Sequence, residues 1–171
     1  MGRFEEIIYK FGLGQSPFPV PQIIVEELKK NAQQKNYINV SGLIELRNLV
    51  AQYHTIKNKN NYTEDNVIIG PGSKELIFHT QLVLDCDVLL PSPSWVSYEP
   101  QAQILNKKIH WIKTDATTNW HITPDDLDKI SKNLHQVEKL LILNSPNNPS
   151  GTTHNNLEAL SLIAKKNNII V

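Results

Sequence analysis

Residues 140–151, LLILNSPNNPSG, contain the pattern that decides the fold. The apolar run LLIL predicts a short buried strand, and the Asn, Ser, Pro and Gly residues that follow it predict a turn. The same change from an apolar run to a polar loop occurs at residues 67–72 (VIIGPG) and 88–95 (VLLPSPSW). The sequence therefore predicts strands that end in loops rich in glycine and proline.

Helical patterns separate these strands. Residues 123–126, Thr-Pro-Asp-Asp, are typical of a helix start, with Thr as the N-cap, Pro at the first helical position and a carboxylate at the third. Strands alternating with helices predict an α/β fold: a mostly parallel sheet with helices on both faces. The last strand begins only at the end of the chain, so we expect a larger sheet that is truncated in mid-sheet. Helices are expected over residues 21–32, 43–53, 73–84, 101–105, from 124 onward and 155–166, and strands over 67–69, 88–90, 109–112, 140–143 and 169–171.

The composition excludes several kinds of partner. The chain has 171 residues, which fits one domain with a hydrophobic core. Its 17 Lys and Arg residues balance its 17 Asp and Glu residues, so no charge excess indicates a nucleic-acid or anionic-membrane partner. We see no signal peptide and no apolar run of membrane-spanning length. A cytoplasmic location is therefore expected.

The cysteine and the histidines give little indication of chemistry. Cys86 is the only cysteine, so no internal disulfide forms. It lies between Asp85 and Asp87, whose carboxylates are expected to raise the thiol pKa, so we expect no reactive thiolate. The six histidines are scattered, and no pair has metal-ligand spacing with a carboxylate. We therefore expect no metal site.

The turn Gly72-Ser73-Lys74 is a candidate anion site. It follows a predicted strand and opens a predicted helix. The N-terminus of a helix offers free N–H groups and the positive end of the helix dipole, which attract phosphate. The turn does not match the Walker A loop, which has a different glycine spacing. The alternative is an ordinary glycine turn with a serine cap.

Two further loops carry candidate binding groups. Trp95 follows the sequence Pro91-Ser92-Pro93, and a rigidly held indole at the end of a strand is suited to stacking on a planar ring. The alternative is an ordinary core tryptophan. Residues 144–151 offer amide donors in a constrained loop, although the same residue types also make plain turns.

In combination, these segments resemble the class I/II aminotransferases, a pyridoxal 5'-phosphate (PLP) family of fold type I that includes the aspartate aminotransferases. Residues 12–18 are similar to the family's Gly-x-Pro-x-Phe loop, and residues 37–47 to its Tyr…Gly-x-x-Glu-Leu-Arg segment. Residues 72–74 fall at its phosphate loop, residues 93–98 at its stacking aromatic, and residues 144–151 match its Asn-x-Pro-x-Asn-Pro-x-Gly signature. The five segments occur in the family's order, and the resemblance covers nearly the whole chain.

The resemblance implies PLP as the cofactor and assigns residues to it. Gly72, Ser73 and Lys74 would hold the phosphate. Trp95 would stack on the pyridine ring. Asn148 would donate a hydrogen bond to the phenolic oxygen of the ring and stabilise its anionic form.

The resemblance also implies a division of the chain and a homodimer. Residues 1–40 would form an N-terminal arm with its loop and first helix, and residues 41–171 part of the PLP-binding large domain. Tyr37 would reach the phosphate of the cofactor in the partner subunit, and Gly14 would offer its backbone to the substrate carboxylate. Cis peptide bonds are expected before Pro93 and Pro149.

The resemblance places no catalytic residue in this chain. The Schiff-base lysine, the acidic partner of the ring nitrogen and the arginine for the substrate carboxylate are expected beyond Val171. Lys74 would lie at the phosphate and would not replace that lysine. The implied function is amino-group transfer between an amino acid and a 2-oxo acid, with the chain alone inactive. Another PLP enzyme of this fold (a lyase or a decarboxylase), a non-catalytic remnant and an interaction module remain open.

Overall fold

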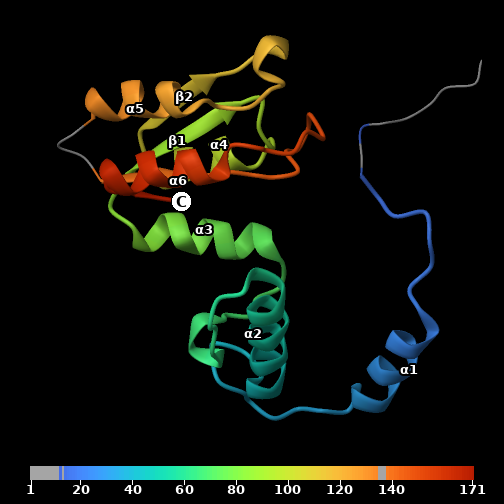
Figure 1. The fold of residues 1–171 in the computed structure, drawn as a ribbon. Helices are drawn as coiled ribbons and strands as arrows, with labels where there is room; N and C mark the ends of the chain where they lie inside the picture. The colour runs from blue at the N-terminus through green and yellow to red at the C-terminus, as the bar shows by residue number, and fades with distance from the viewer. Residues whose placement is uncertain (1–11, 13, 135–137) are drawn as a thin grey trace, which may run out of the picture.

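The computed structural model describes residue 12, residues 14–134 and residues 138–171 (Figure 1). Apolar runs form the strands and the segments between them form the helices, as the sequence pattern predicts. The strands are β1 (Asp87–Ser92), β2 (Ile109–Lys113), β3 (Lys139–Leu141) and β4 (Ile169–Ile170). The helices are α1 (Gln22–Asn31), α2 (Ile44–Asn58), α3 (Ser73–Val83), α4 (Tyr98–Ile104), α5 (Pro124–Lys132) and α6 (Leu157–Lys166), with 3-10 turns η1 (Glu64–Asn66) and η2 (Ala116–Thr118).

The strands form one parallel sheet in the order β2-β1-β3-β4, which confirms the predicted α/β class. In β1, Val88 lies opposite Ile109 of β2 on one side and Leu140 of β3 on the other. The chain leaves β1 for the neighbour on one side and then crosses to the neighbour on the other side. The point between β1 and β3 is therefore a topological switch point, where open α/β sheets bind ligands.

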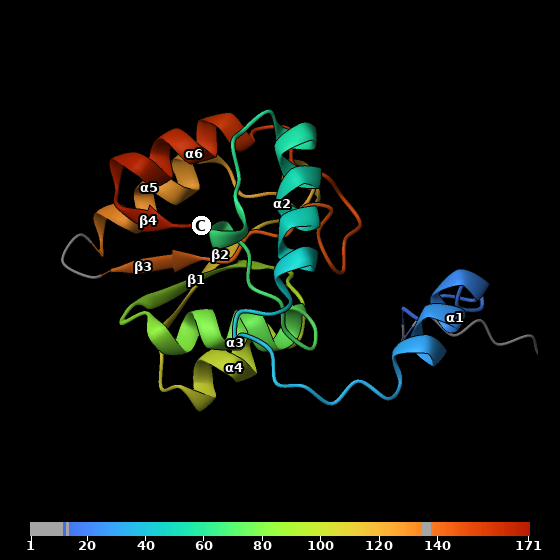
Figure 2. The same cartoon turned by 90° about the horizontal axis from the view of Figure 1, so that it is seen from below.

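Helices cover both faces of the sheet (Figure 2). Figure 2 shows α5 and α6 on one side and α3 and α4 on the other. Successive residues of a strand point to opposite faces, so Leu89 packs in the core with Leu127 of α5, while Val88 and Leu90 pack with Tyr98 of α4. A strand buried on both faces needs apolar residues at every position, which explains the unbroken apolar runs in the sequence.

The start of α5 confirms the predicted helix signal. Thr123 Oγ1 accepts a hydrogen bond from the N–H of Asp126 (3.1 Å), and the Asp126 carboxylate accepts one from the N–H of Thr123 (3.1 Å). This reciprocal capping box satisfies two backbone donors at the helix N-terminus. Asp128 in the same helix accepts hydrogen bonds from Lys132 in α5 and from Asn167 after α6, and so holds the two helices together.

The prediction of a strand over residues 67–69 is wrong. The segment is extended, but it pairs with no strand of the described chain, and its hydrogen bonds go elsewhere. The N–H of Ile69 donates to the carbonyl of Ser41 (2.9 Å). The buried guanidinium of Arg47 donates to the carbonyl of Val67 (2.9 Å). Gly42, at φ +102°, approaches so closely that a Cβ there would lie 2.6 Å from the Cβ of Ile69.

Several predicted boundaries also change, including those of α2, which extends to Asn58, and α4, which begins at Tyr98. β1 continues past its predicted end because the carbonyl of Ser92 accepts a hydrogen bond from the N–H of Thr114 (3.2 Å). β3 ends at Leu141, two residues before its predicted end. Helix α6 begins after Asn156, not Asn155, and the Asn156 amide donates to the carbonyl of Ile122 (3.1 Å) instead of capping the helix.

The peptide bonds before prolines agree with the sequence prediction and extend it. Cis bonds occur before Pro93 and Pro149, as predicted, and a third occurs before Pro146.

None of the helices in the described part of the chain is long and apolar enough to cross a membrane.

Leu127→Ala tests the core on the α5 and α6 side of the sheet. Leu127 is fully buried, so the substitution should lower the free energy of unfolding by about 2–5 kcal/mol through lost burial and a residual cavity. Leu162, on α6, is 64% exposed, and Leu162→Ala should cost less than about 0.5 kcal/mol. Urea denaturation of the three proteins measures both effects. Equal losses in the two variants would contradict this packing.

Candidate functional site

The loops after β1 and β3 meet at the switch point. Asn147, in the loop after β3, is 8% exposed. Its amide nitrogen donates to the carbonyl of Pro93 after β1 (3.3 Å) and to the hydroxyl of Ser150 in its own loop (2.9 Å). The backbone carbonyl of Asn147 accepts from the N–H of Gly151 (2.7 Å), which closes the loop on itself. One buried amide therefore fixes the two candidate loops relative to each other.

The turn before α3 supplies a helix N-terminus with no cap. Gly72 occupies the N-cap position with φ +106°, a conformation that side-chain-bearing residues rarely adopt. A Cβ at Gly72 would meet no described atom within 4 Å, so glycine is needed here for its backbone conformation. Within the described structure no side chain caps α3, and Ser73 and Lys74 are exposed. The serine-capped turn that the sequence allowed is therefore not observed, and the first N–H groups are available to an anion.

Lys74 and Trp95 are brought together at this turn. The Lys74 ammonium lies 5.8 Å from the centroid of the Trp95 ring, within the range of a cation–π interaction. Trp95 is half-buried and packs edge-to-face on Tyr98, with ring centroids 5.4 Å apart. Trp95 therefore packs on the core, as the alternative interpretation of the sequence predicts, and it still has exposed surface that could stack on a ring. A cation, a helix N-terminus and an aromatic ring share one side of the site.

Asn148 is exposed, in contrast to its neighbour Asn147. Its backbone N–H donates to the side-chain carbonyl of Asn144 (2.8 Å), which fixes its place in the loop. Its side-chain amide makes no hydrogen bond to any described residue, so it is available to a ligand. The sequence motif singled out Asn148 and missed the positioning role of Asn147, because two adjacent asparagines in a turn carry the same local signal.

Tyr37 and Gly14 are not brought to this group. Both belong to the described part of the expected arm, residues 14–40, which extends away from the sheet (Figure 1). Tyr37 is fully exposed, and a Cβ at Gly14 would meet no described atom within 4 Å. Helix α1 in the same arm leaves Ile24 and Leu28 largely exposed. The roles expected for Tyr37 and Gly14 stay predictions.

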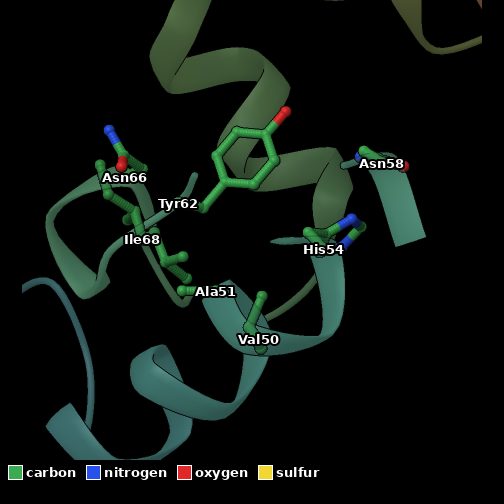
Figure 3. A pocket seen from close by; sticks show the side chains of 8 residues that line it. Val50, Ala51, His54, Asn58, Tyr62, Asn66 and Ile68 are labelled. Atoms are coloured by element: carbon green, nitrogen blue, oxygen red, sulfur yellow. The ribbon is translucent and has the colours of Figure 1, made fainter. Parts of the chain in front are cut away.

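A cavity of about 410 Å³ adjoins the candidate turn. It lies between α3 and the sheet, and polar groups from Ser73 and Asn144 share its lining with apolar residues of β3 and β4. A second cavity, of about 330 Å³, lies beside α2 and contains none of the predicted site residues (Figure 3). In Figure 3 the side chains of His54 and Tyr62 line this second cavity. The chemistry-bearing groups therefore belong to the first cavity and the loops next to it.

The titratable groups outside the loops are structural. Cys86 is buried, and burial is the main cause of its raised pKa, with smaller contributions from Asp87 and Asp85. The predicted direction is confirmed, but the main cause is burial and not the carboxylates. His121 and His154 are buried and stacked with ring centroids 4.1 Å apart. Across the described residues, no three His, Cys, Asp or Glu side chains gather as metal ligands would.

Comparison with known proteins identifies similar chains. The sequence profile of the family described as aminotransferase class I and II matches residues 6–171. The aspartate aminotransferase of Thermotoga maritima is 29% identical over 173 residues, which cover 97% of this chain and 45% of that protein. Its solved structure superimposes with a TM-score of 0.82 at 28% identity, covering 96% of this chain and 45% of that one. The aromatic aminotransferase of Pyrococcus horikoshii superimposes with a TM-score of 0.81 at 26% identity, covering 94% and 44%.

The coverage is unequal in every one of these matches. Nearly all of this chain aligns, whereas less than half of each of the relatives named above does. The chain therefore spans under half the length of these relatives.

Substitutions of the adjacent asparagines test the loop geometry. Asn147→Ala removes the amide that joins the two loops and should lower the free energy of unfolding by about 1–3 kcal/mol, because a buried hydrogen-bond network is broken. Asn148→Ala removes only an exposed side chain, so its effect should stay within about 0.5 kcal/mol. Urea denaturation measures both. Equal stability of the two variants would refute the positioning role of Asn147.

The buried His154 should make stability depend on pH. Burial lowers the pKa of His154 below its ordinary value of 6.5. The folded chain binds this proton less tightly than the unfolded chain does. The contribution of His154 to stability is therefore full above pH 6.5 and is lost as the pH falls through its lowered pKa.

Denaturation from about pH 8 down to about pH 5 should show this loss in the unmodified chain. The loss should be smaller in His154→Gln, whose side chain does not titrate. The control, His79→Gln, alters an exposed histidine of α3 and should retain the pH dependence of the unmodified chain. If the free energy of unfolding changes equally with pH in all three proteins, His154 is not the group responsible.

Proposed function

Since this chain belongs to the aminotransferase class I and II family, we propose that the protein acts in amino-group transfer between an amino acid and a 2-oxo acid, with PLP as cofactor. One observation carries the proposal: the uncapped N-terminus of α3 with Lys74 lies beside Trp95, next to the loop after β3. A helix N-terminus suits a phosphate, and an indole suits a planar ring. The two occur together at the carboxyl end of a parallel sheet, where such folds bind ligands.

The residues present fit the phosphate of this cofactor. The first N–H groups of α3 would donate to phosphate oxygens, aided by the positive end of the helix dipole. Gly72 sets the direction of the chain into the helix, Ser73 adds a hydroxyl donor, and Lys74 adds a positive charge. Because the described structure leaves these donors without a side-chain cap, no internal contact has to break when a phosphate binds.

The residues present also fit the ring. When bound, the cofactor supplies an electron-withdrawing ring that accepts electrons released at the α carbon of the substrate. Trp95 would cover one face of that ring, and its packing on Tyr98 restricts the indole to a narrow range of orientations. The free amide of Asn148 would donate to the phenolic oxygen and stabilise its anionic form.

The N-terminal arm is proposed to act on a second subunit. We assign residues 1–40 to the arm and residues 41–171 to part of the PLP-binding domain. In a homodimer, Tyr37 would reach the cofactor phosphate of the partner subunit, and the exposed apolar side chains of α1, Ile24 and Leu28, would be covered by the partner's surface. Gly14 would offer its backbone to the substrate carboxylate. A cytoplasmic location is part of the same proposal.

The 171 residues are proposed to hold the cofactor without completing the reaction. The lysine that bonds to the cofactor, the acidic group at the ring nitrogen and the arginine for the substrate carboxylate are assigned to the part of the family's length that this chain does not span. Lys74 is assigned to the phosphate. The chain alone should therefore bind PLP reversibly and transfer no amino group, with aspartate or any other amino acid as donor.

Titration of the purified chain with PLP, followed by the absorbance of the cofactor, tests the proposed phosphate and ring site. Lys74→Gln removes the positive charge at the turn and should weaken binding about tenfold, as expected for loss of a charge-assisted contact. Lys57→Gln is the matched control, because Lys57 also lies over an aromatic ring (5.7 Å from the centroid of Tyr53) but not at a helix N-terminus. It should bind PLP as the unmodified chain does.

Two results would count against the proposal. Equal affinity of the two lysine variants would remove Lys74 from the phosphate site. Borohydride reduction that labels a lysine of this chain stoichiometrically, or measurable amino-group transfer by the chain alone, would show that the chemistry does not need residues beyond those present.

A further inference from the structure

Two buried glutamines lie beneath the candidate phosphate turn. Gln81 of α3 is fully buried, and Gln101 of α4 is 6% exposed. The amide nitrogen of Gln101 donates to the backbone carbonyl of Lys74 (2.8 Å), and that of Gln81 donates to the side-chain oxygen of Gln101 (3.1 Å). The two side chains thus form a hydrogen-bonded chain that ends on the backbone of the first turn of α3.

The direction of this chain is fixed by its last member. The backbone carbonyl of Lys74 only accepts hydrogen bonds, so Gln101 must present its NH₂ group there. Its oxygen then faces Gln81 and accepts from the NH₂ group of that residue. The side-chain oxygen of Gln81 is buried and has no hydrogen-bond partner among the described residues. The orientation of both amides therefore follows from donor and acceptor chemistry alone.

Stability alone does not explain this pair. A buried acceptor without a partner costs free energy, whereas two apolar side chains of the same shape carry no such cost. An apolar contact would also pack α3 against α4. What an apolar pair lacks is the directional bond to the carbonyl of Lys74.

That bond joins the two halves of the candidate site. Lys74 lies in the turn that would hold phosphate. Gln101 lies in α4, which begins three residues after Trp95, and the N–H of its first residue, Tyr98, donates to the carbonyl of Trp95 (3.1 Å). Gln101 therefore ties the phosphate turn to the helix whose first residue bonds to the backbone of Trp95.

We propose that Gln101, through its bond to the carbonyl of Lys74, is a positioning residue that sets the first turn of α3 at a fixed distance from Trp95. The phosphate and the ring of the cofactor are joined covalently, so the groups that hold them must keep a matching separation. The expected effect of Gln101 on PLP affinity rests on the function proposed above. Its effect on the position of Lys74 relative to Trp95 in the ligand-free chain is independent of that function.

Three methionine variants separate positioning from packing, because methionine keeps the shape of glutamine and removes its hydrogen bonds. Gln101→Met leaves Gln81 without a partner and should lower stability. Gln81→Met keeps the bond to Lys74. The double variant replaces both partners by apolar groups and should recover the stability that Gln101→Met loses. Urea denaturation establishes this order.

The affinity for PLP should follow a different order. Gln101→Met and the double variant should both bind about tenfold more weakly, because both lack the bond to Lys74. Gln81→Met should stay within about threefold of the unmodified chain. If affinity instead returns in the double variant together with stability, the glutamines serve packing alone and the positioning role is wrong.

A ligand-free measurement makes the test independent of the proposed function. In the unmodified chain the ring current of Trp95 should shift the NMR signals of the Lys74 methylenes. The shifts should persist in Gln81→Met and collapse in Gln101→Met and in the double variant. If the unmodified chain fails to bind PLP, the proposed function fails while these shifts still decide the positioning role. Unchanged Lys74 shifts in the double variant overturn it.

Discussion

The site depends on the parallel pairing of β1 with β2 on one side and β3 on the other. A parallel neighbour is reached only by a crossover, so α4 returns the chain to β2 across one face and α5 leads it to β3 across the other. The loops that leave β1 and β3 consequently diverge to opposite faces and open a crevice between their strands. Because β1 and β3 are neighbours, the two loops still start side by side, where the Asn147 amide reaches the carbonyl of Pro93.

The anion binding proposed for this edge depends on the backbone more than on charge. The chain as a whole has no net charge, and among the described residues Lys74 is the one cation placed against the Trp95 ring. The available donors are N–H groups that every helix leaves unpaired at its start. Gly72 permits the abrupt entry into α3, and no neighbouring side chain in the described structure competes for those donors. A local backbone feature is thereby turned into a site by its position at the end of the sheet.

Much of this arrangement could be predicted from the sequence, and the exceptions share a physical cause. Four of the five apolar runs predicted as strands, the capping box at Thr123 and the helix that starts after Gly72 are local signals that have the predicted structure. Residues 67–69 carry the same apolar signal as a strand, but a strand also requires a neighbour, and here the segment bonds to Ser41 and Arg47 instead. Sequence pattern reports what a segment can form and not which partner it finds.

The same reason explains why the residues that hold the site together were missed. Trp95, Lys74 and Asn148 keep exposed surface and match a motif, whereas Asn147, Gln81 and Gln101 are buried and match none. A buried amide is identified only by its distant partner: Pro93 for Asn147, and the carbonyl of Lys74 for Gln101. Each of these contacts joins loops or helices that leave different parts of the chain. The residues proposed to face a ligand are thus identified from motifs, whereas the buried amides that join their loops and helices are identified only from the folded structure.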